Sequence, residues 1–489
     1  MNTKTTPQPA PGGLGRGLFA STDIAVGEEV LHLPVPFVAV LDTEHLGEVC
    51  SGCFGQRQLE EEGIALKGCR GCGVVKYCDK TCQAKDWKLG HSLECTIYQK
   101  LKPRILPINA RAVLRMVLRS ERQKYSDEEL DQFLQLETHI KDIRDKNASQ
   151  WERISLSSKA IKAYSGTDMS EEVISAMGAK LDLNSFNLTN AVYDRLGVYL
   201  HPYAAIFNHS CDHNAAVSFD GPNLHIKALR PIQKGEQIFI TYIDVTDPYP
   251  IRQHNLQSRY YFTCHCSKCT SEAASPTATT LHPAQQDAYD IIQSLSTLEN
   301  PTQSILKALT TLKSTPIPPT TQPSISLLDE LITSLLAQQK YKSAFTYAAA
   351  RYRAVDPVVY PLKGHPIRLL HAWVLARLAI HLSQGVEVGS TAAGGGGGGG
   401  GVDGEVALEK YELNFNLIIW SVLAALVGME GTGGTGPGFW RLVKREFRAV
   451  RGEFVAAGLD PRGSKELERE IGREWGKVDK VVRELEFSI

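Results

Sequence analysis

The chain has 489 residues, which is enough for two to four domains with hydrophobic cores of their own. Its formal net charge of −1 provides no overall field to draw it onto nucleic acid or an anionic membrane. Residues 1–13 lack the apolar stretch of a signal peptide, and the longest apolar run, residues 417–427, is too short to span a bilayer. We therefore expect a soluble intracellular protein in which this run forms a buried helix.

Glycines dominate residues 12–19, which read Gly-Gly-Leu-Gly-Arg-Gly-Leu-Phe. They permit backbone conformations with positive φ and a close approach to a ligand. The apolar stretches that follow, residues 30–33 and 37–40, have the pattern of short strands. Because no helix signal follows the glycines, a phosphate-binding loop and a dinucleotide fingerprint are excluded, and a turn between strands is favoured.

The eleven cysteines all lie between Cys50 and Cys269. In a reducing compartment, cysteines are metal ligands or scattered core residues rather than disulfides. Eight potential ligands fall in residues 50–95 as four pairs: Cys50-x₂-Cys53, Cys69-x₂-Cys72, Cys78-x₃-Cys82 and His91-x₃-Cys95. Eight ligands supply two tetrahedral zinc sites, and a segment this short depends on its metal for most of its folding energy.

Residues 107–181 carry apolar side chains at helical spacing. Ser126 and Glu129 form the pattern of a capping box that opens one of these helices. His139 falls in the same block, and a helical histidine is by itself most often a surface or core residue.

Short strand patterns follow at residues 184–187, 197–200, 216–219, 224–229 and 237–242, with Asp220-Gly221 as a hairpin turn. A third metal motif overlaps this region: Cys211 precedes Cys264-x-Cys266-x₂-Cys269 by about fifty residues. Four thiolates leave no open coordination position, so we predict a structural zinc site. The chain between these cysteines forms a loop whose neck carries Asn208, His209 and Tyr242.

Beyond Cys269, a Ser/Thr/Pro-rich linker runs to about Leu281, and the remainder is predicted to be helical. Residues 341–347 and 364–366 are typical of TPR-like helical repeats, which form binding or packing surfaces. Two glycine-rich stretches, residues 394–401 and 431–438, are predicted to be flexible insertions between helices.

Residues 75–78 (Val-Lys-Tyr-Cys) and Trp87 before His91 complete a pattern that resembles a MYND zinc finger. The resemblance implies interleaved ligands: Cys50, Cys53, Cys78 and Cys82 for one zinc, and Cys69, Cys72, His91 and Cys95 for the other. Together with residues 208–211, residues 235–242 and the cysteine tail, the chain resembles the SET-and-MYND family of protein lysine methyltransferases over residues 12–385. Seven cysteines in the finger and four in the third site account for all eleven.

The resemblance implies an α+β multidomain fold in which a β-rich SET fold is split by the MYND finger and a helical insert. The expected parts are a SET N-terminal part (12–49), the MYND finger (50–95), a helical SET insert (96–182), the SET C-terminal core (183–246), a post-SET zinc segment (247–270) and a helical TPR-like C-terminal domain with glycine-rich insertions (281–489).

In function, the resemblance implies an S-adenosylmethionine-dependent protein lysine N-methyltransferase that acts on histone or other protein lysines. Tyr242 is the expected catalytic residue. The expected cofactor-binding residues are Leu14, Gly15, Arg16, His139, Asn184, Asn208, His209, Tyr260 and Phe262. A monomer in the nucleus and cytoplasm is expected, without nucleic acid or membrane as partner.

Tyr242 is the residue type that methyl transfer from a sulfonium needs. The transfer is an in-line displacement, so geometry contributes much of the acceleration. The amine must arrive neutral although free lysine has a pKa of about 10.4, and a dry channel beside a sulfonium lowers that pKa. The Tyr242 hydroxyl would orient the amine and the methyl group, partly through weak C–H···O contacts.

The chain departs from the family pattern at two places. Leu14 stands where family members often carry a basic residue, which predicts a weaker or purely backbone contact with the cofactor's carboxylate. His213-Asn214 stands in place of the usual Pro-Asn, which shifts a loop but removes no ligand and no catalytic group.

Two other functions compete with the enzyme. One is a non-catalytic adaptor whose finger binds proline-rich peptides or transcription-factor partners. The other is DNA binding, which a basic face on the finger suggests (Lys67, Arg70, Lys76, Lys80, Lys85 and Lys88), but the sequence shows no recognition helix. Tyr242, Asn208, His209 and Phe262 favour the enzyme.

Overall fold

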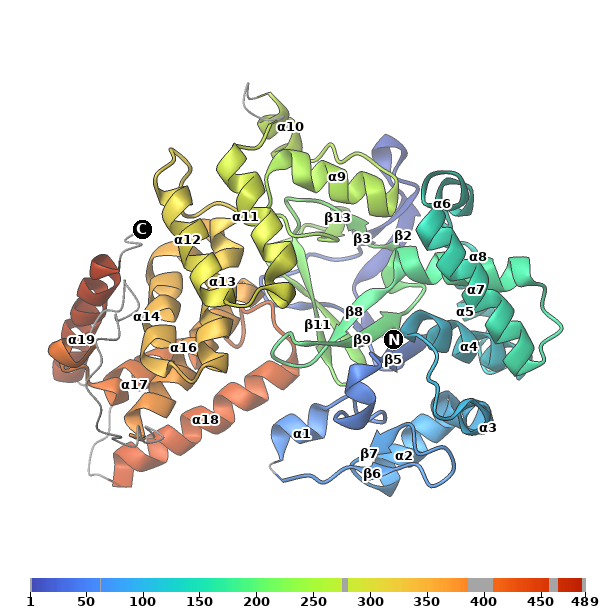
Figure 1. Ribbon diagram of the computed structural model, residues 1–489, viewed down its shortest axis with the longest axis horizontal. Coiled ribbons are helices and arrows are strands. Elements are labelled where there is room, and N and C mark those ends of the chain that lie inside the picture. Colours follow the sequence, from blue (N-terminus) through green and yellow to red (C-terminus); the bar gives the residue numbers. More distant parts are fainter. Residues whose placement is uncertain (1, 62, 275–279, 386–407, 457–464, 486–489) are drawn as a thin grey trace. The chain divides into compact units, whose positions relative to one another are not determined.

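The computed structural model describes residues 2–61, 63–274, 280–385, 408–456 and 465–485 (Figure 1). The chain divides into two compact units. The first unit consists of residues 1–242, 254–266 and 434–442, and the second unit consists of residues 243–253, 267–433 and 443–489.

The first unit contains the strands, which form three sheets and a small ribbon. The sheet orders are β1-β4-β12-β11, β10-β13-β3-β2 and β5-β9-β8, and β6 pairs with β7. The strands are β1 Asn2–Thr3, β2 Thr5–Pro9, β3 Arg16–Ala20, β4 Glu29–Leu33, β5 Val38–Leu41, β6 Lys67–Gly68, β7 Lys76–Tyr77, β8 Phe186–Thr189, β9 Arg195–Leu200, β10 Asn208–His209, β11 Ala215–Asp220, β12 Asn223–Ala228 and β13 Gln237–Ile240.

The helices of the first unit belong mainly to the finger and to the insert that follows it in the chain. They are α1 Gln56–Glu60, α2 Lys80–Asp86, α3 Ser92–Leu101, α4 Ile108–Glu121, α5 Asp127–Leu134, α6 Ile140–Lys146, α7 Ala148–Ser165 and α8 Glu171–Asn184, with short segments η1 Pro11–Gly13, η2 Glu44–Gly47, η3 Trp87–His91 and η4 Ala204–Ile206. In Figure 1, α4 to α8 gather beside the sheets, and α2, β6 and β7 lie together in the finger. The Ser126–Glu129 capping box at the start of α5 is confirmed.

The polar start of the chain forms two strands that the sequence did not predict. Thr5 to Pro9 pair with β3 in an antiparallel ladder, and β1 pairs with β4. The Thr5 hydroxyl is buried and lies 2.9 Å from the hydroxyl of Tyr203. The glycine-rich residues therefore occupy the turn of a β2–β3 hairpin, as expected.

Three arginines of α4 are buried against strand β5. Arg111 donates to the carbonyl oxygen of Leu41 at 2.7 Å, and Arg115 donates to that of Ala39 at 3.0 Å. Arg119 donates to the carbonyl oxygen of Phe37 at 2.5 Å. Arginines four residues apart on a helix share one face. They satisfy carbonyl groups of β5 and of Phe37 just before it, on the side that faces away from the partner β9, so this sheet edge is closed by side chains.

Arg115 also joins the finger to α4. Its guanidinium donates to both carboxylate oxygens of Glu94 in α3 at 2.7 Å, and it lies 3.3 Å from Asp86 in α2. Both carboxylates are fully buried. Burial alone would raise the pKa of Glu94, but the charge and hydrogen bonds of Arg115 lower it to about 2.

The second unit is helical. Its helices are α10 Ser267–Ala273, α11 Pro283–Ser294, α12 Pro301–Lys313, α13 Ser324–Ala337, α14 Tyr341–Ala350, α15 Asp356–Val359, α16 Pro366–Ser383, α17 Phe415–Gly428 and α19 Lys465–Glu484, with η5 Leu295–Thr297, η6 Arg351–Val355 and η7 Leu408–Tyr411. Two more helices, α9 Tyr249–Tyr260 and α18 Pro437–Ala456, are divided between the units.

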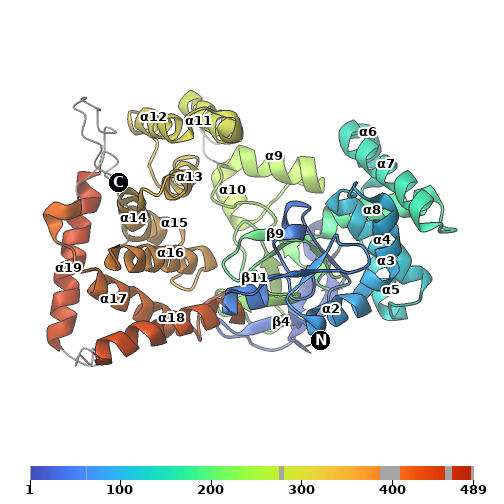
Figure 2. The same cartoon turned by 60° about the horizontal axis from the view of Figure 1, so that its bottom comes forward.

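Neighbouring helices of the second unit pack pairwise, α11 on α12, α12 on α13, α13 on α14 and α16 on α17 (Figure 2). Leu327, Leu331 and Leu335 form the buried face of α13 at helical spacing. The predicted buried helix over residues 417–427 is confirmed as α17. Among the described residues, no helix is long and apolar enough to cross a membrane.

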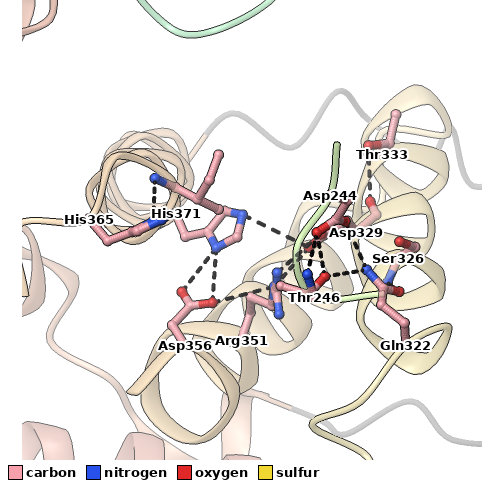
Figure 3. Close-up of polar contacts among 11 residues, drawn as sticks. Asp244, Thr246, Gln322, Ser326, Asp329, Thr333, Arg351, Asp356, His365 and His371 are labelled. Atoms are coloured by element: carbon pink, nitrogen blue, oxygen red, sulfur yellow. Dashed lines mark hydrogen bonds and ion pairs between the residues drawn. The ribbon is translucent and has the colours of Figure 1, made fainter. Parts of the chain in front are cut away.

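A buried charge network joins three helices of the second unit (Figure 3). Arg351 donates to Asp329 of α13 at 2.9 and 3.2 Å and is only 1 % exposed. His371 of α16 lies 3.0 Å from both carboxylate oxygens of Asp356, which is fully buried. Because a buried charge needs a partner, this network fixes how α13, α15 and α16 pack together.

The two glycine-rich stretches, both predicted to be flexible insertions, differ in what the structure shows. Residues 394–401 lie outside the described residues. For residues 431–438 the prediction of a flexible insertion is wrong, because Thr435 is fully buried and residues 434–442 belong to the first unit. A Cβ atom on Gly436 would lie 2.9 Å from the hydroxyl oxygen of Ser218. Glycine here permits close packing on β11.

Two smaller expectations also need correction. His139 does not lie within a helix; it is a left-handed residue with φ 43° immediately before α6. Strands β11 and β12 pair as far as Asp220 and Asn223, so the hairpin turn is Gly221-Pro222 instead of Asp220-Gly221. Gly221 has φ 60°, which a glycine adopts without strain.

Candidate active site and zinc centres

A cavity of about 720 Å³ opens in the first unit. Residues 13–16, 135–137, 183–187, 205–209, 240–242 and 259–262, together with His139, line its wall. The ten residues predicted for catalysis and cofactor binding all line this cavity: Leu14, Gly15, Arg16, His139, Asn184, Asn208, His209, Tyr242, Tyr260 and Phe262. The fold therefore brings residues far apart in sequence to one place.

Strands β10 and β13 form one wall of the cavity. They run parallel, with Asn208 opposite Phe239 and His209 opposite Ile240. Parallel neighbours need a long crossover connection, which here contains the β11–β12 hairpin. The chain therefore returns beside His209 and continues directly to Tyr242.

Asn214 and Asn208 fix this arrangement. The Asn214 amide donates to the carbonyl oxygen of Gln237 at 3.0 Å and accepts from the backbone of Phe239 at 2.8 Å. The departure from the family pattern beside His213 thus leaves this connection in place. The Asn208 amide donates to the carbonyl oxygen of Arg16 at 2.9 Å, which ties the glycine-rich turn to β10.

Hydrogen bonds define the tautomer of His209 and the orientation of Tyr242. The Tyr242 backbone N–H donates to Nδ1 of His209 at 3.1 Å. Nε2 of His209 therefore carries the hydrogen, and it lies 3.3 Å from Sγ of Cys211. The Tyr242 hydroxyl donates to the carbonyl oxygen of Phe207, which leaves its own lone pairs for a ligand.

Tyr242 is a neutral hydroxyl at ordinary pH. Burial raises the pKa of Tyr242 well above its usual value, and the neighbouring Tyr260 acts in the same direction. The two rings lie 4.9 Å apart, and the Tyr260 hydroxyl donates to the Tyr242 carbonyl oxygen at 3.4 Å. His209 lies 5.4 Å from the ring of Tyr242 and 6.1 Å from that of Phe262. These aromatic groups make an apolar wall beside one oriented hydroxyl.

The turn that carries His139 is anchored from α8. Lys180 donates to the carbonyl oxygens of Leu134, at 2.8 Å, and Leu136. Asn184 donates to that of Glu137 at 3.0 Å. Asn184 therefore lines the cavity and also holds in place the turn that forms part of the cavity wall.

Sequence reasoning missed Tyr261, which lies opposite His139 in the cavity wall. The two rings stack with their centres 5.0 Å apart and an interplanar angle of 28°. Both residues have left-handed backbones, with φ 43° for His139 and φ 63° for Tyr261. Such conformations cost about 1–3 kcal/mol each and concentrate at functional sites. The only available signal was the aromatic run Tyr260-Tyr261-Phe262.

We expect Tyr261→Ala to raise the donor KM about five-fold with little change in kcat, because loss of the ring contact releases His139 from the cavity wall. Tyr261→Phe is the matched control and should behave like the unsubstituted protein, since the stacked ring remains. Steady-state kinetics with varied donor concentration measures both variants. Equal KM values for Tyr261→Ala and the unsubstituted protein would exclude this positioning role.

Two cysteine clusters in the finger match zinc geometry. One contains Cys50, Cys53, Cys78 and Cys82, and the other contains Cys69, Cys72, His91 and Cys95, the interleaved sets that the family resemblance implies. The sulfurs of Cys53 and Cys78 lie 3.8 Å apart, as do those of Cys69 and Cys95. A tetrahedron with Zn–S bonds of about 2.3 Å has edges of about 3.8 Å, so both clusters fit zinc.

The first unit supplies three thiolates of the third site. Sγ atoms of Cys211, Cys264 and Cys266 lie within 4.8 Å of one another. The sequence assigns the fourth position to Cys269, which follows Cys266 by three residues. His209 contacts Cys211, so this site and the cavity share one hydrogen-bonded histidine.

We expect purified protein to contain three zinc ions per chain, one for each cluster. A strong chelator should unfold the finger, because its metal supplies most of its folding energy. Elemental analysis and loss of far-ultraviolet ellipticity measure the two effects. Two or fewer ions in fully folded protein would contradict the assignment.

Comparisons with known proteins agree with this geometry. A family model described as the SET domain matches residues 15–243. The "SET domain and MYND-type zinc finger protein 6" of Schizosaccharomyces pombe is 31% identical over 259 residues, which are 53% of this chain and 50% of that protein. Residues 15–243 match a SET domain and the relatives are SET and MYND proteins, which supports the resemblance to that family.

A second SET and MYND relative, "Histone-lysine N-methyltransferase SMYD3" of Mus musculus, is 26% identical over 383 residues, 75% of this chain and 86% of that protein. The chain thus spans about half the length of the fission-yeast relative and most of the mouse relative. The solved "Structure of Rubisco LSMT bound to AdoMet" is 15% identical over 93% of this chain and 88% of that chain, and its TM-score of 0.27 adds nothing to the assignment.

Proposed function

We propose that this protein is an S-adenosylmethionine-dependent protein lysine N-methyltransferase that acts on histone or other protein lysines. The observation that carries the proposal is the single cavity that ten predicted donor-binding and catalytic residues line. Its wall combines exposed backbone at residues 13–15 with an apolar aromatic surface and one oriented hydroxyl.

Residues on two sides of the cavity suit the donor. Gly15 has φ 72° and is exposed, so its peptide groups are open to the methionine part of the donor. Asn208 offers its side-chain oxygen for a polar contact, His209 lines the cavity beside it, and Phe262 offers a face for the adenine ring. Leu14 carries no charge, so the donor carboxylate depends on backbone groups and on Arg16.

Tyr242 orients the reacting groups and does not act as a strong base. Its hydroxyl hydrogen is donated to Phe207, so its oxygen accepts from the incoming amine and from the transferred methyl group. The lysine ammonium would give its proton to water as it enters, because the apolar wall disfavours the charged form and a bound donor's positive sulfonium would repel it. The chain's contribution is an aligned, dry approach path.

The proposed partners and location follow from the family resemblance. In the proposal, the finger binds proline-rich peptides and the protein works as a monomer in the nucleus and cytoplasm. Size-exclusion chromatography with light scattering, and pull-down by proline-rich peptides, would test the first two.

A methylation assay tests the proposed reaction. Purified protein and donor with a radiolabelled methyl group are incubated with core histones and with cell extract. Labelled lysine in acid hydrolysates is the expected result. Absence of labelled lysine from every fraction would favour the adaptor function, in which the cavity has no catalytic use.

A further inference from the structure

A free guanidinium lies at the rim of the cavity. Arg259 lines the cavity and is exposed, and its guanidinium carbon lies 5.2 Å from the centre of the Tyr260 ring. Tyr260 lies in turn 4.9 Å from Tyr242. The groups therefore form a series from the buried His209, through Tyr242 and Tyr260, to an exposed positive charge.

The other charged side chains that line the cavity already have partners. Arg16 donates to Gln135 at 2.6 Å, and His139 lies 3.2 Å from Asp142. Glu137 accepts from the backbone N–H groups of His139 and Thr138, which hold the pKa of its carboxyl below the usual value. Among these described lining residues, Arg259 alone has neither an ion pair nor a side-chain hydrogen bond.

The ring contact orients this charge without neutralising it. An arginine over an aromatic face gains a cation–π attraction and keeps its donors available. A planar guanidinium binds a carboxylate through two parallel hydrogen bonds. Arg259 is thus a positioned carboxylate-binding group at the side of the tyrosine pair.

We propose that Arg259 selects protein substrates that carry an acidic residue beside the target lysine, an inference that rests on the proposed lysine methyltransferase function. A substrate lysine that reaches Tyr242 brings its neighbouring residues towards Tyr260 and the rim, where Arg259 lies. A carboxylate there pairs with Arg259, and a second cation there is repelled. The specificity residue thus lies outside the reacting centre.

The alternative anion is the donor's own carboxylate. Arg16 lies next to the glycine-rich turn and shares the cavity, so it is the cation assigned to that carboxylate. Arg259 directly precedes Tyr260, whose ring lies beside the expected catalytic Tyr242, and it belongs to the end of α9. The arrangement therefore favours the peptide over the donor as the partner of Arg259.

A charge-swap experiment tests this inference. The probes are three fluorescein-labelled Gly-Ser peptides with one central lysine, flanked on both sides by Glu, by Gln or by Lys. Their binding is measured by anisotropy with S-adenosylhomocysteine present, and their methylation is measured as kcat/KM. The variants are Arg259→Gln and Arg259→Glu. Arg122→Glu, an exposed arginine at the end of α4, is the matched control.

The unsubstituted protein and Arg122→Glu should prefer the Glu-flanked peptide over the Lys-flanked one about five-fold, as expected for one exposed charge pair. Arg259→Gln should remove the preference, and Arg259→Glu should reverse it. Raising the salt concentration to about 1 M should weaken the preference, because it shortens the screening length to about 3 Å.

An unchanged preference in Arg259→Glu would overturn the inference, and so would a donor affinity that falls in Arg259→Glu while peptide selection persists. Failure of the proposed function has a different signature. In that case no peptide is methylated by any protein, and the anisotropy ratios alone decide the role of Arg259.

Discussion

Tyr242→Phe should lower kcat for methyl transfer about 100- to 1,000-fold, the range observed when one preorganised polar group is removed from a transition-state site. The phenylalanine keeps the ring contacts with His209 and Tyr260, so the cavity wall stays intact. What disappears is the oxygen that the Phe207 carbonyl holds in place for the amine and the methyl group. Donor affinity should change by less than about two-fold, because the ring itself remains.

The measurement is single-turnover methylation with labelled donor, together with a thermal unfolding curve. Tyr199→Phe is the matched control, since it removes another buried tyrosine hydroxyl of the first unit that does not line the cavity. The control should keep its rate. If Tyr242→Phe methylates as fast as the control, the hydroxyl has no role in the reaction.

Arg115→Met should destabilise the first unit by about 3–5 kcal/mol, because it leaves buried charges without their partner. Glu94 and Asp86 both lose their cation, and the carbonyl group of Ala39 loses a donor. The methionine keeps much of the apolar stem, so the effect reports charge and hydrogen bonding more than lost volume.

Urea unfolding followed by zinc release to a chromogenic chelator measures this loss at the finger. Arg122→Met is the control and should leave the midpoint unchanged, because Arg122 is exposed. Adding Glu94→Gln to Arg115→Met should recover part of the loss, since a neutral amide costs less to bury than an unpaired carboxylate. A loss of less than about 1 kcal/mol in Arg115→Met would show that Glu94 is not ionised as described.

Local sequence patterns were enough to predict the zinc ligands of the finger and most strands of the SET C-terminal core. The cysteine spacings identified the metal ligands of the finger because residues two to four apart can share one ion. Strands β8, β9, β11, β12 and β13 were predictable because each pairs with a close neighbour or follows a turn signal, whereas β10 pairs only with the distant β13. The cavity residues came from the family resemblance, and no spacing argument would have brought His139 next to residues 260–262.

The rest depends on contacts between distant segments. Arg111, Arg115 and Arg119 look like a solvated helix face in sequence, and their burial is explained only by distant segments, the β5 edge and the carboxylates of the finger. Residues 431–438 look flexible because glycine is common both in linkers and where backbones pack closely. Arg259 gave no signal and Tyr261 gave only that of its aromatic run, because their roles arise from the rings beside them in the folded chain.

Isothermal titration calorimetry with S-adenosylmethionine tests the central claim most directly, because it asks whether the cavity of the first unit holds a methyl donor. The account predicts one donor bound per zinc-loaded chain, with an affinity that Asn208→Ala weakens about ten-fold through the loss of one buried polar contact. Folded, zinc-loaded protein that binds no donor would contradict it.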